Sequence, residues 1–307
     1  MLLNMTGQYR LTGGDPPDPD PEEIQQNDPR WVWELDPQRP WSELTQYNGN
    51  RQVTNLSLTQ FTNSGALPAN DGTNQIYERV SDPSGSGRTV YRHHLHKDLA
   101  YGTGWSNQTW RSEISNTAQT PVWGQEYWLA TAVRLGTDFS VNDFSINIFE
   151  FHVPYPQPNA IGISPFTMFV STNFNAAVRY NAGTPSTQND YTTAATWSAA
   201  ATREVWHFLI LNFKLGADST SNFLRMWHKE GSGSLTQVMN YTGRIGYDAN
   251  SASGDRHNYA KCGMYSWTYP WPGTSTSRTL WNRGFRLIKA DAGTPTINQN
   301  VMLALLE

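Results

Sequence analysis

The chain has 307 residues and a formal net charge of −4; 16% of its residues are charged and 13% are aromatic. Disordered chains are rich in charge and poor in aromatic residues, so this composition predicts a folded chain. The slight acidic excess disfavours nucleic acid as a partner, because binding it requires cations that neutralise phosphates. No run of about 18 apolar residues is present, so we expect no membrane-spanning segment and no membrane partner.

The N-terminal part of the sequence differs in composition from the rest. Residues 13–23 are dense in Gly, Pro, Asp and Glu, which predicts an extended, self-repelling segment. We therefore expect residues 1–29 to form a tail or linker and residues 30–307 to form a single domain. The first seven residues lack the basic and long apolar segments of a secretory signal peptide. The protein then stays inside the cell, leaves by another route or is shown without its leader.

The segment at residues 91–97 carries three histidines. In a strand, His94 and His96 share a face with Arg92, while His93 lies on the opposite face. Three interpretations are open: cleft histidines, inert surface residues or zinc ligands. No carboxylate or cysteine stands nearby at ligand spacing, so we predict no metal site. We favour His94 and His96 as the pair that faces a ligand.

Two later segments place chemically active side chains on one face of a predicted strand. In residues 109–114, Arg111 and Glu113 share a face, so the arginine is oriented and can fork onto a carboxylate. The alternative is a surface ion pair. In residues 146–154, Glu150 and His152 share a face, and histidine suits proton transfer near neutral pH. The alternative there is a histidine at the end of a strand.

The middle of the chain indicates the fold class. Residues 206–214 are apolar at both odd and even positions, as in a central strand buried on both faces. Residues 223–238 read as a hairpin around Glu230–Gly233. Many short strands separated by turns rich in Gly and Pro predict an all-β protein, a β-sandwich or jelly roll.

Residues 258–265 alternate clearly between two faces. Tyr259, Lys261, Gly263 and Tyr265 share one face, and an apolar set that includes Cys262 forms the other. We expect Cys262, the single cysteine, to be a buried apolar residue and Gly263 to leave room for a ligand. The aromatic loop at residues 267–272 follows; its Trp271 either stacks on a sugar ring or packs on its own domain.

Taken together, these motifs resemble those of alginate lyases of polysaccharide lyase family 7. The matching elements are Arg-Ser-Glu-Ile at 111–114, a strand that ends in His152, and Tyr-x-Lys-x-Gly-x-Tyr at 259–265. The wider arrangement, over about residues 75–290, also resembles the heparin-lyase-I-like and glucuronan lyase families. The resemblance implies a concanavalin-like β-jelly roll with a substrate groove on its concave sheet. It also implies β-elimination on an anionic, uronate-containing polysaccharide, no cofactor, and an extracellular or virion-associated location.

The resemblance also implies roles for individual residues. Tyr259 is expected to be both base and acid, or the acid alone, and His152 a carboxylate neutraliser or the base. Arg111 is expected to neutralise the substrate carboxylate. The expected substrate-binding residues are Lys261, Glu113, His94, His96, Tyr265 and Trp271.

Glu150 departs from the family pattern, which has glutamine at that position. Glu150 either acts in its protonated form beside the substrate carboxylate, or acts ionised by holding His152 or Arg111 in place. We expect the protonated form, because the family has an amide there.

Two other classes of function remain open from the sequence. One is a non-catalytic carbohydrate-binding jelly roll, although a pure binder has no need of Arg111, His152 and Tyr259 together. The other is a concanavalin-like glycoside hydrolase that uses Glu113 and Glu150 as its carboxyl pair. The Glu-x-Asp-x-Glu strand usual in such hydrolases is absent.

Overall fold

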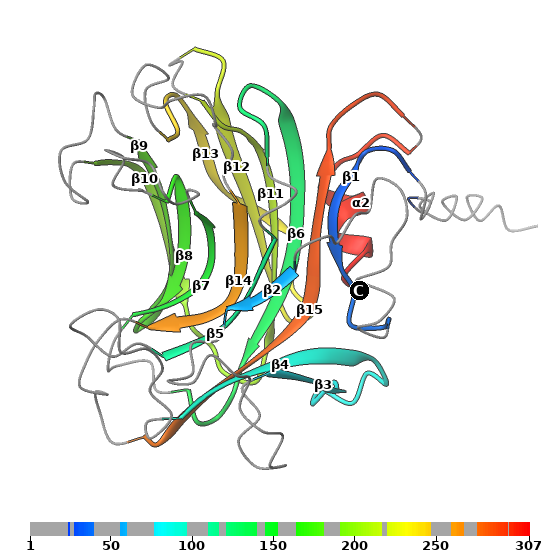
Figure 1. The fold of residues 1–307 in the computed structure, drawn as a ribbon, viewed down its shortest axis with the longest axis vertical. Helices are drawn as coiled ribbons and strands as arrows, with labels where there is room; N and C mark the ends of the chain where they lie inside the picture. The colour runs from blue at the N-terminus through cyan, green and yellow to red at the C-terminus, as the bar shows by residue number, and fades with distance from the viewer. Residues whose placement is uncertain are drawn as a thin grey trace, which may run out of the picture.

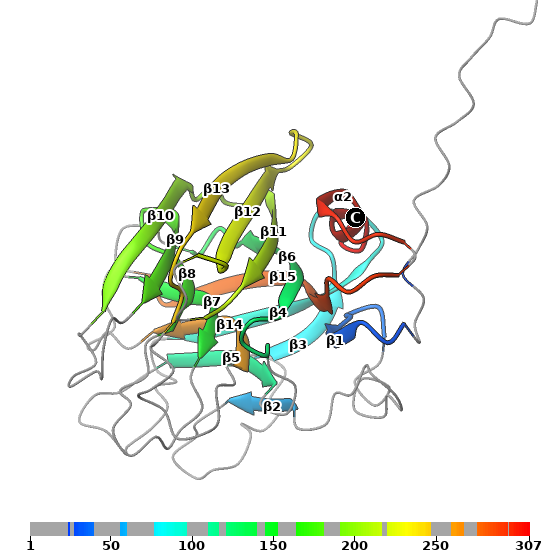
Figure 2. The ribbon, with the colours of Figure 1, turned by 90° about the horizontal axis from the view of Figure 1, so that it is seen from above.

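The computed structural model describes residues 24, 28–39, 56–59, 77–96, 110–116, 121–139, 145–152, 164–180, 191–216, 220–246, 259–266, 275–293 and 295–307. Within these ranges the strands pair antiparallel and form two sheets that face each other (Figures 1 and 2). This two-layer arrangement confirms the predicted all-β jelly-roll sandwich.

One sheet has eight described strands. Its order is β13 (Thr236–Thr242), β12 (Phe223–Glu230), β11 (Trp206–Lys214), β6 (Glu126–Leu135), β15 (Ser277–Lys289), β4 (Thr89–His96) and β3 (Tyr77–Ser81), with β1 (Trp31–Leu35) paired to β15. The hairpin predicted at residues 223–238 is confirmed as β12 and β13.

The second sheet has seven described strands and carries the candidate site. Its order is β10 (Thr192–Ala200), β9 (Asn173–Tyr180), β8 (Phe166–Val170), β7 (Ile146–His152), β14 (Tyr259–Ser266), β5 (Trp110–Asn116) and β2 (Leu56–Thr59). Because β5, β7 and β14 are far apart in the sequence, only long-range pairing makes them neighbours.

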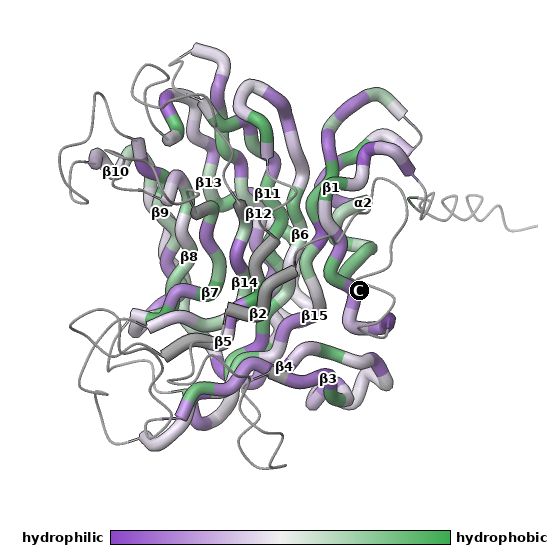
Figure 3. The backbone as a smooth tube through the Cα atoms, viewed as in Figure 1, coloured by the Kyte–Doolittle hydropathy of each residue, from purple (hydrophilic) through white to green (hydrophobic). Residues whose placement is uncertain are grey.

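The main core lies between the two sheets. Phe151 of β7 contacts Phe213 of β11, with ring centroids 4.7 Å apart. Apolar (green) and polar (purple) segments both occur along the strands, as Figure 3 shows. Each inward apolar side chain therefore adds to one continuous core, which sets the pairing register.

A second apolar cluster covers the outer face of the eight-stranded sheet. It includes Phe208 and Ile210 of β11 and Met302 of the helix α2 (Gln299–Ala304). Strand β11 is therefore buried on both faces, which confirms the central strand predicted at residues 206–214. Ile24 belongs to the same cluster, so buried contacts begin before residue 30. The division into 1–29 and 30–307 stays a prediction.

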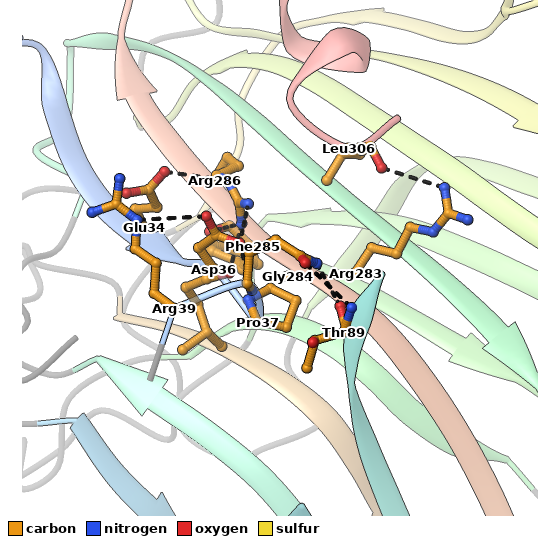
Figure 4. Close-up of polar contacts among 12 residues, drawn as sticks. Glu34, Asp36, Pro37, Arg39, Thr89, Arg283, Gly284, Phe285, Arg286 and Leu306 are labelled. Atoms are coloured by element: carbon orange, nitrogen blue, oxygen red, sulfur yellow. Dashed lines mark hydrogen bonds and ion pairs between the residues drawn. The ribbon is translucent and has the colours of Figure 1, made fainter. Parts of the chain in front are cut away.

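Strand β1 is fixed to β15 by charged side chains (Figure 4). Arg286 of β15 lies between two carboxylates, with Nε 3.5 Å from Glu34 and an Nη atom 3.2 Å from Asp36. Its other Nη atom donates to the carbonyl oxygen of Leu35 at 2.6 Å. These contacts involve the eight-stranded sheet, away from the residues that carry the candidate chemistry.

Candidate active site

The three motif-bearing segments pair as neighbouring strands, with β14 between β5 and β7 (Figure 1). On one side, Tyr265 is opposite Arg111 and Gly263 is opposite Glu113. On the other side of β14, two further pairs of opposite residues join it to β7.

Those pairs are Tyr259 with His152 and Lys261 with Glu150. Directly opposite residues on neighbouring strands lie on the same face of a sheet. We call this face, which carries Glu113, Lys261 and Glu150 and is turned away from the eight-stranded sheet, the site face.

The opposite face of these strands belongs to the core. Ala260, Cys262 and Met264 of β14 are buried against the other sheet, as the alternation predicted. Burial raises the pKa of the Cys262 thiol, and the nearby Glu113 adds to that shift. The prediction that Cys262 is a buried apolar residue is confirmed.

Glu150 and Lys261 form an ion pair on the site face. The Lys261 Nζ atom lies 3.3 Å from Glu150 Oε1, and the two residues are only 4% and 5% exposed, respectively. Ser164 donates its hydroxyl to Glu150 Oε2 at 3.0 Å, and the Asn147 side-chain amide donates to the same oxygen at 3.4 Å. A carboxyl group that faces an ammonium and accepts two hydrogen bonds favours its ionised form. These contacts support the alternative in which Glu150 acts ionised, and the role of Glu150 stays a prediction.

Asn147 and Ser164 were not singled out from the sequence. In a regular strand Asn147 and Glu150, three positions apart, lie on opposite faces. The pairing of β7 with β8 shifts register between Asn147 and Phe149, which brings Asn147 to the face of Glu150. No feature of the local sequence indicates this bulge. Ser164 lies outside both strands, two residues before β8 begins at Phe166.

Gly263 has a structural role different from the predicted one. Its φ is +128°, and a Cβ atom there would lie 2.1 Å from the Ser112 carbonyl oxygen and 2.9 Å from His93 Cε1. The space beside Gly263 is therefore filled by β5 and by a side chain of the other sheet. The expectation that Gly263 leaves room for a ligand is wrong in this respect, because the close neighbour is the protein itself.

The histidines of β4 divide between the two faces of the strand as the alternation predicted. His93 is fully buried between the sheets, and its Nδ1 donates to the carbonyl oxygen of Ser112 at 2.8 Å. Burial lowers the pKa of His93 to about 4, so the ring is neutral at neutral pH.

His94 and His96 lie on the outer face of the eight-stranded sheet, with their rings 6.5 Å apart. Tyr91 and Leu95 of the same strand face the main core, so His94 and His96 are not on the site face, and their role in substrate binding stays a prediction. The alternation places both histidines on one face of β4, but β4 belongs to the eight-stranded sheet and the site face belongs to the seven-stranded sheet.

The remaining predicted residues are described only in part. Arg111, His152 and Tyr259 are placed by their backbone pairing alone, and Trp271 lies outside the described residues. Glu113 is 3% exposed, and Tyr265 is half-buried. The substrate groove expected over this sheet stays a prediction.

Two features of the described residues bear on other functions. These residues contain no cluster of three or more His, Cys, Asp or Glu side chains able to hold a metal ion. Among the same residues, none of the helices is long and apolar enough to span a membrane.

The described strands define a two-layer β-sandwich with charged residues on the outer face of one sheet. The family model described as "Polysaccharide lyase" matches residues 40–286, so the chain belongs to that family. It is therefore a polysaccharide lyase, and its substrate is a polysaccharide. A search of curated proteins found no match to this chain.

Three solved structures show the likeness in fold. The endo-β-1,4-glucuronan lyase of the fungus Trichoderma reesei has a TM-score of 0.54 and 16% identity, covering 76% of this chain and 95% of that chain. A GH131 β-glucanase catalytic domain from Podospora anserina has a TM-score of 0.52 and 15% identity, with coverages of 87% and 97%. The PL-14 alginate lyase of Aplysia kurodai has a TM-score of 0.51 and 9% identity, with coverages of 84% and 99%. At these identities the likeness concerns the fold alone.

Proposed function

We propose that this enzyme cleaves a uronic-acid polysaccharide, such as alginate or glucuronan, by β-elimination on the site face. One observation carries the proposal: Tyr259 is opposite His152, and Tyr265 is opposite Arg111, on three adjacent strands. Adjacent strands are about 4.8 Å apart, so residues on β5, β14 and β7 lie within reach of one or two sugar units. β-Elimination needs three groups close together: one that neutralises the substrate carboxylate, a base and an acid.

In the proposed reaction, a base removes the C5 proton of a uronate. The electron pair forms the C4=C5 double bond, the C4–O4 bond breaks, and an acid protonates the leaving O4. Negative charge grows on the substrate carboxylate, where preorganised donors stabilise the transition state most. Arg111 neutralises that carboxylate, His152 shares this role or acts as the base, and Tyr259 is both base and acid or the acid alone.

The ion pair on the site face supports this chemistry. Lys261 lies two positions from Tyr259 on β14, and Glu150 holds the Lys261 ammonium at 3.3 Å. A nearby cation stabilises an ionised phenol, so a fixed Lys261 would assist Tyr259 as a base. Glu113, Tyr265 and Trp271 are proposed to contact the sugar units. Because a polymeric glycan cannot cross a cell membrane, the enzyme would meet it outside the cell or on a virion.

The test is an assay with alginate and polyglucuronate that follows the ultraviolet absorbance of the C4=C5 double bond. We expect absorbance to rise with the wild type. Tyr259→Phe should lower turnover at least about 100-fold, the low end for general acid–base catalysis, with polymer binding intact. Arg111→Lys keeps the charge but loses the bidentate fork, and it should also lower turnover strongly.

The same assay separates the other functions. New reducing ends without the absorbance would show hydrolysis, the chemistry that the name of the GH131 β-glucanase implies for that protein. Binding without either product would show a binding module. Near-native turnover of Tyr259→Phe would remove this residue from the mechanism.

A further inference from the structure

A second arginine, Arg179 of β9, belongs to the site face. Its Nη1 atom donates to the hydroxyl of Thr167 on β8 at 3.0 Å. Thr167 is directly opposite Glu150 of the ion pair described above. The guanidinium carbon of Arg179 also lies 5.1 Å from the ring centroid of Tyr191, next to β10.

Arg179 continues the row of the proposed catalytic residues across the sheet. Tyr259 is opposite His152, and Glu150 of β7 is opposite Thr167 of β8. Continuing this antiparallel register by two residues places Pro165 beside His152. The backbone N–H of Arg179 donates to the Pro165 carbonyl oxygen at 2.9 Å. Tyr259 and Arg179 are thus separated by three strand spacings, about 14 Å at about 4.8 Å each. A polymer that crosses the strands spans this distance with a few sugar units.

Arg179 forms no ion pair with any of the described residues, whereas Lys261 on the same face is paired with Glu150. Arg179 is half-buried, and its Nε atom is buried without a hydrogen-bond partner among the described residues. Thr167 and Tyr191 hold its guanidinium in place. Tyr191 is 40% exposed, one of two large apolar side chains so exposed in the described part of the chain.

We propose that Arg179 and Tyr191 form a subsite for a sugar unit that carries a carboxylate. This unit lies a few sugar units along the polysaccharide from the cleaved bond. The guanidinium of Arg179 forks onto the carboxylate, a planar geometry that suits this ion. The ring of Tyr191 packs on the sugar and keeps the guanidinium oriented. This subsite rests on the proposed function for its polymer, but its binding can be measured without any turnover.

The chain offers a matched control in Arg225 of β12. It is also half-buried and in none of the ion pairs of the described residues. It donates to Asn212 at 3.3 Å and lies 4.5 Å from the ring centroid of Phe223. Arg225 lies on the outer face of the eight-stranded sheet, away from the site face. Replacing either arginine by glutamine removes the same charge from a similar setting.

The experiment measures binding of polyglucuronate and alginate by affinity electrophoresis in polymer-containing gels. Because a charge-assisted contact to the carboxylate is lost, Arg179→Gln should weaken binding of at least one polymer by about 10-fold or more. Arg225→Gln should bind like the wild type. Reducing the polymer's carboxyl groups to alcohols should abolish the difference between the wild type and Arg179→Gln. In kinetics, Arg179→Gln should raise KM on long polymer and leave kcat little changed.

The outcomes separate this subsite from the proposed reaction. Weaker binding by Arg179→Gln, with no C4=C5 absorbance from the wild type, would support the subsite and overturn the elimination. Active elimination with unchanged binding by Arg179→Gln would overturn the subsite alone. An equal loss with Arg225→Gln would overturn it as well, because it would show a general effect of charge. Absence of wild-type binding to both polymers would also overturn it.

Discussion

Replacing Glu150 by glutamine tests the role of the ion pair on the site face. Glutamine keeps the size of the side chain and can still accept hydrogen bonds from Ser164 and Asn147 through its amide oxygen. It removes the negative charge that faces the Lys261 ammonium at 3.3 Å. Both side chains are nearly buried, and breaking such a pair from one side typically costs about 3–5 kcal/mol. We expect the lower end, about 3 kcal/mol, because the hydrogen-bond acceptor is retained.

The assay combines urea unfolding with a pH–rate profile of the same proteins. Glu150→Gln should unfold at lower urea, and its rate should fall at every pH because Lys261 loses the charge that holds it. Adding Lys261→Met should recover part of the stability, since the double variant no longer places a buried ammonium beside a neutral amide. The coupling in this double-mutant cycle should exceed about 1 kcal/mol.

A matched control is the pair of Arg92 and Glu78 on the other sheet, whose side chains are more exposed. Glu78→Gln should cost under about 1 kcal/mol, the usual range for exposed ion pairs. The reasoning would be refuted if Glu150→Gln were as stable as the wild type and kept or raised its rate, with activity extended to higher pH. That result would restore the protonated role that the family's amide suggests.

Two further predictions concern the contact between the sheets. Gly263→Ala should destabilise the fold by about 3–5 kcal/mol, adding a positive-φ strain of about 1–3 kcal/mol to a clash with the Ser112 carbonyl oxygen. Gly85→Ala, at φ +77° with no atom of the described residues within 4 Å of where its Cβ would lie, should cost only the strain, and equal losses in urea unfolding would exclude the clash. Because burial holds the pKa of His93 at about 4, below its usual 6.5, the unfolded chain takes up a proton first as pH falls. Stability should therefore be complete above pH 6.5 and fall between 6.5 and 4, less so in His93→Gln, and a flat urea midpoint between pH 6.5 and 5 would contradict this.

The sequence was informative where structure depends on near neighbours. The alternation at residues 258–265 predicted a strand with Cys262 inward and Lys261 on the opposite face, as observed. The double apolar parity of residues 206–214 predicted a central strand, and β11 is buried on both faces. Both features follow from the fixed period of two in a strand, which needs no knowledge of the partner strands. The order of three motifs was likewise sufficient to indicate the lyase family.

The same local rule misled where the partner strand decides the outcome. His94 and His96 share a face with each other, as predicted, but parity does not say to which sheet that face belongs. The register shift in β7 moved Asn147 to the side of Glu150, and Gly263 meets the backbone of β5 and the ring of His93. These placements depend on residues distant in the chain.

The sequence by itself therefore determined which residues alternate, which segments become strands and to which enzyme family the chain belongs. Only the tertiary structure decided that Lys261 pairs with Glu150 and that Arg179 lies in one row with Tyr259 and His152. The physical reason is that side-chain alternation is a property of each strand, whereas the neighbours of a strand are chosen by the burial of the whole core. Charges on separate strands meet only after that choice is made.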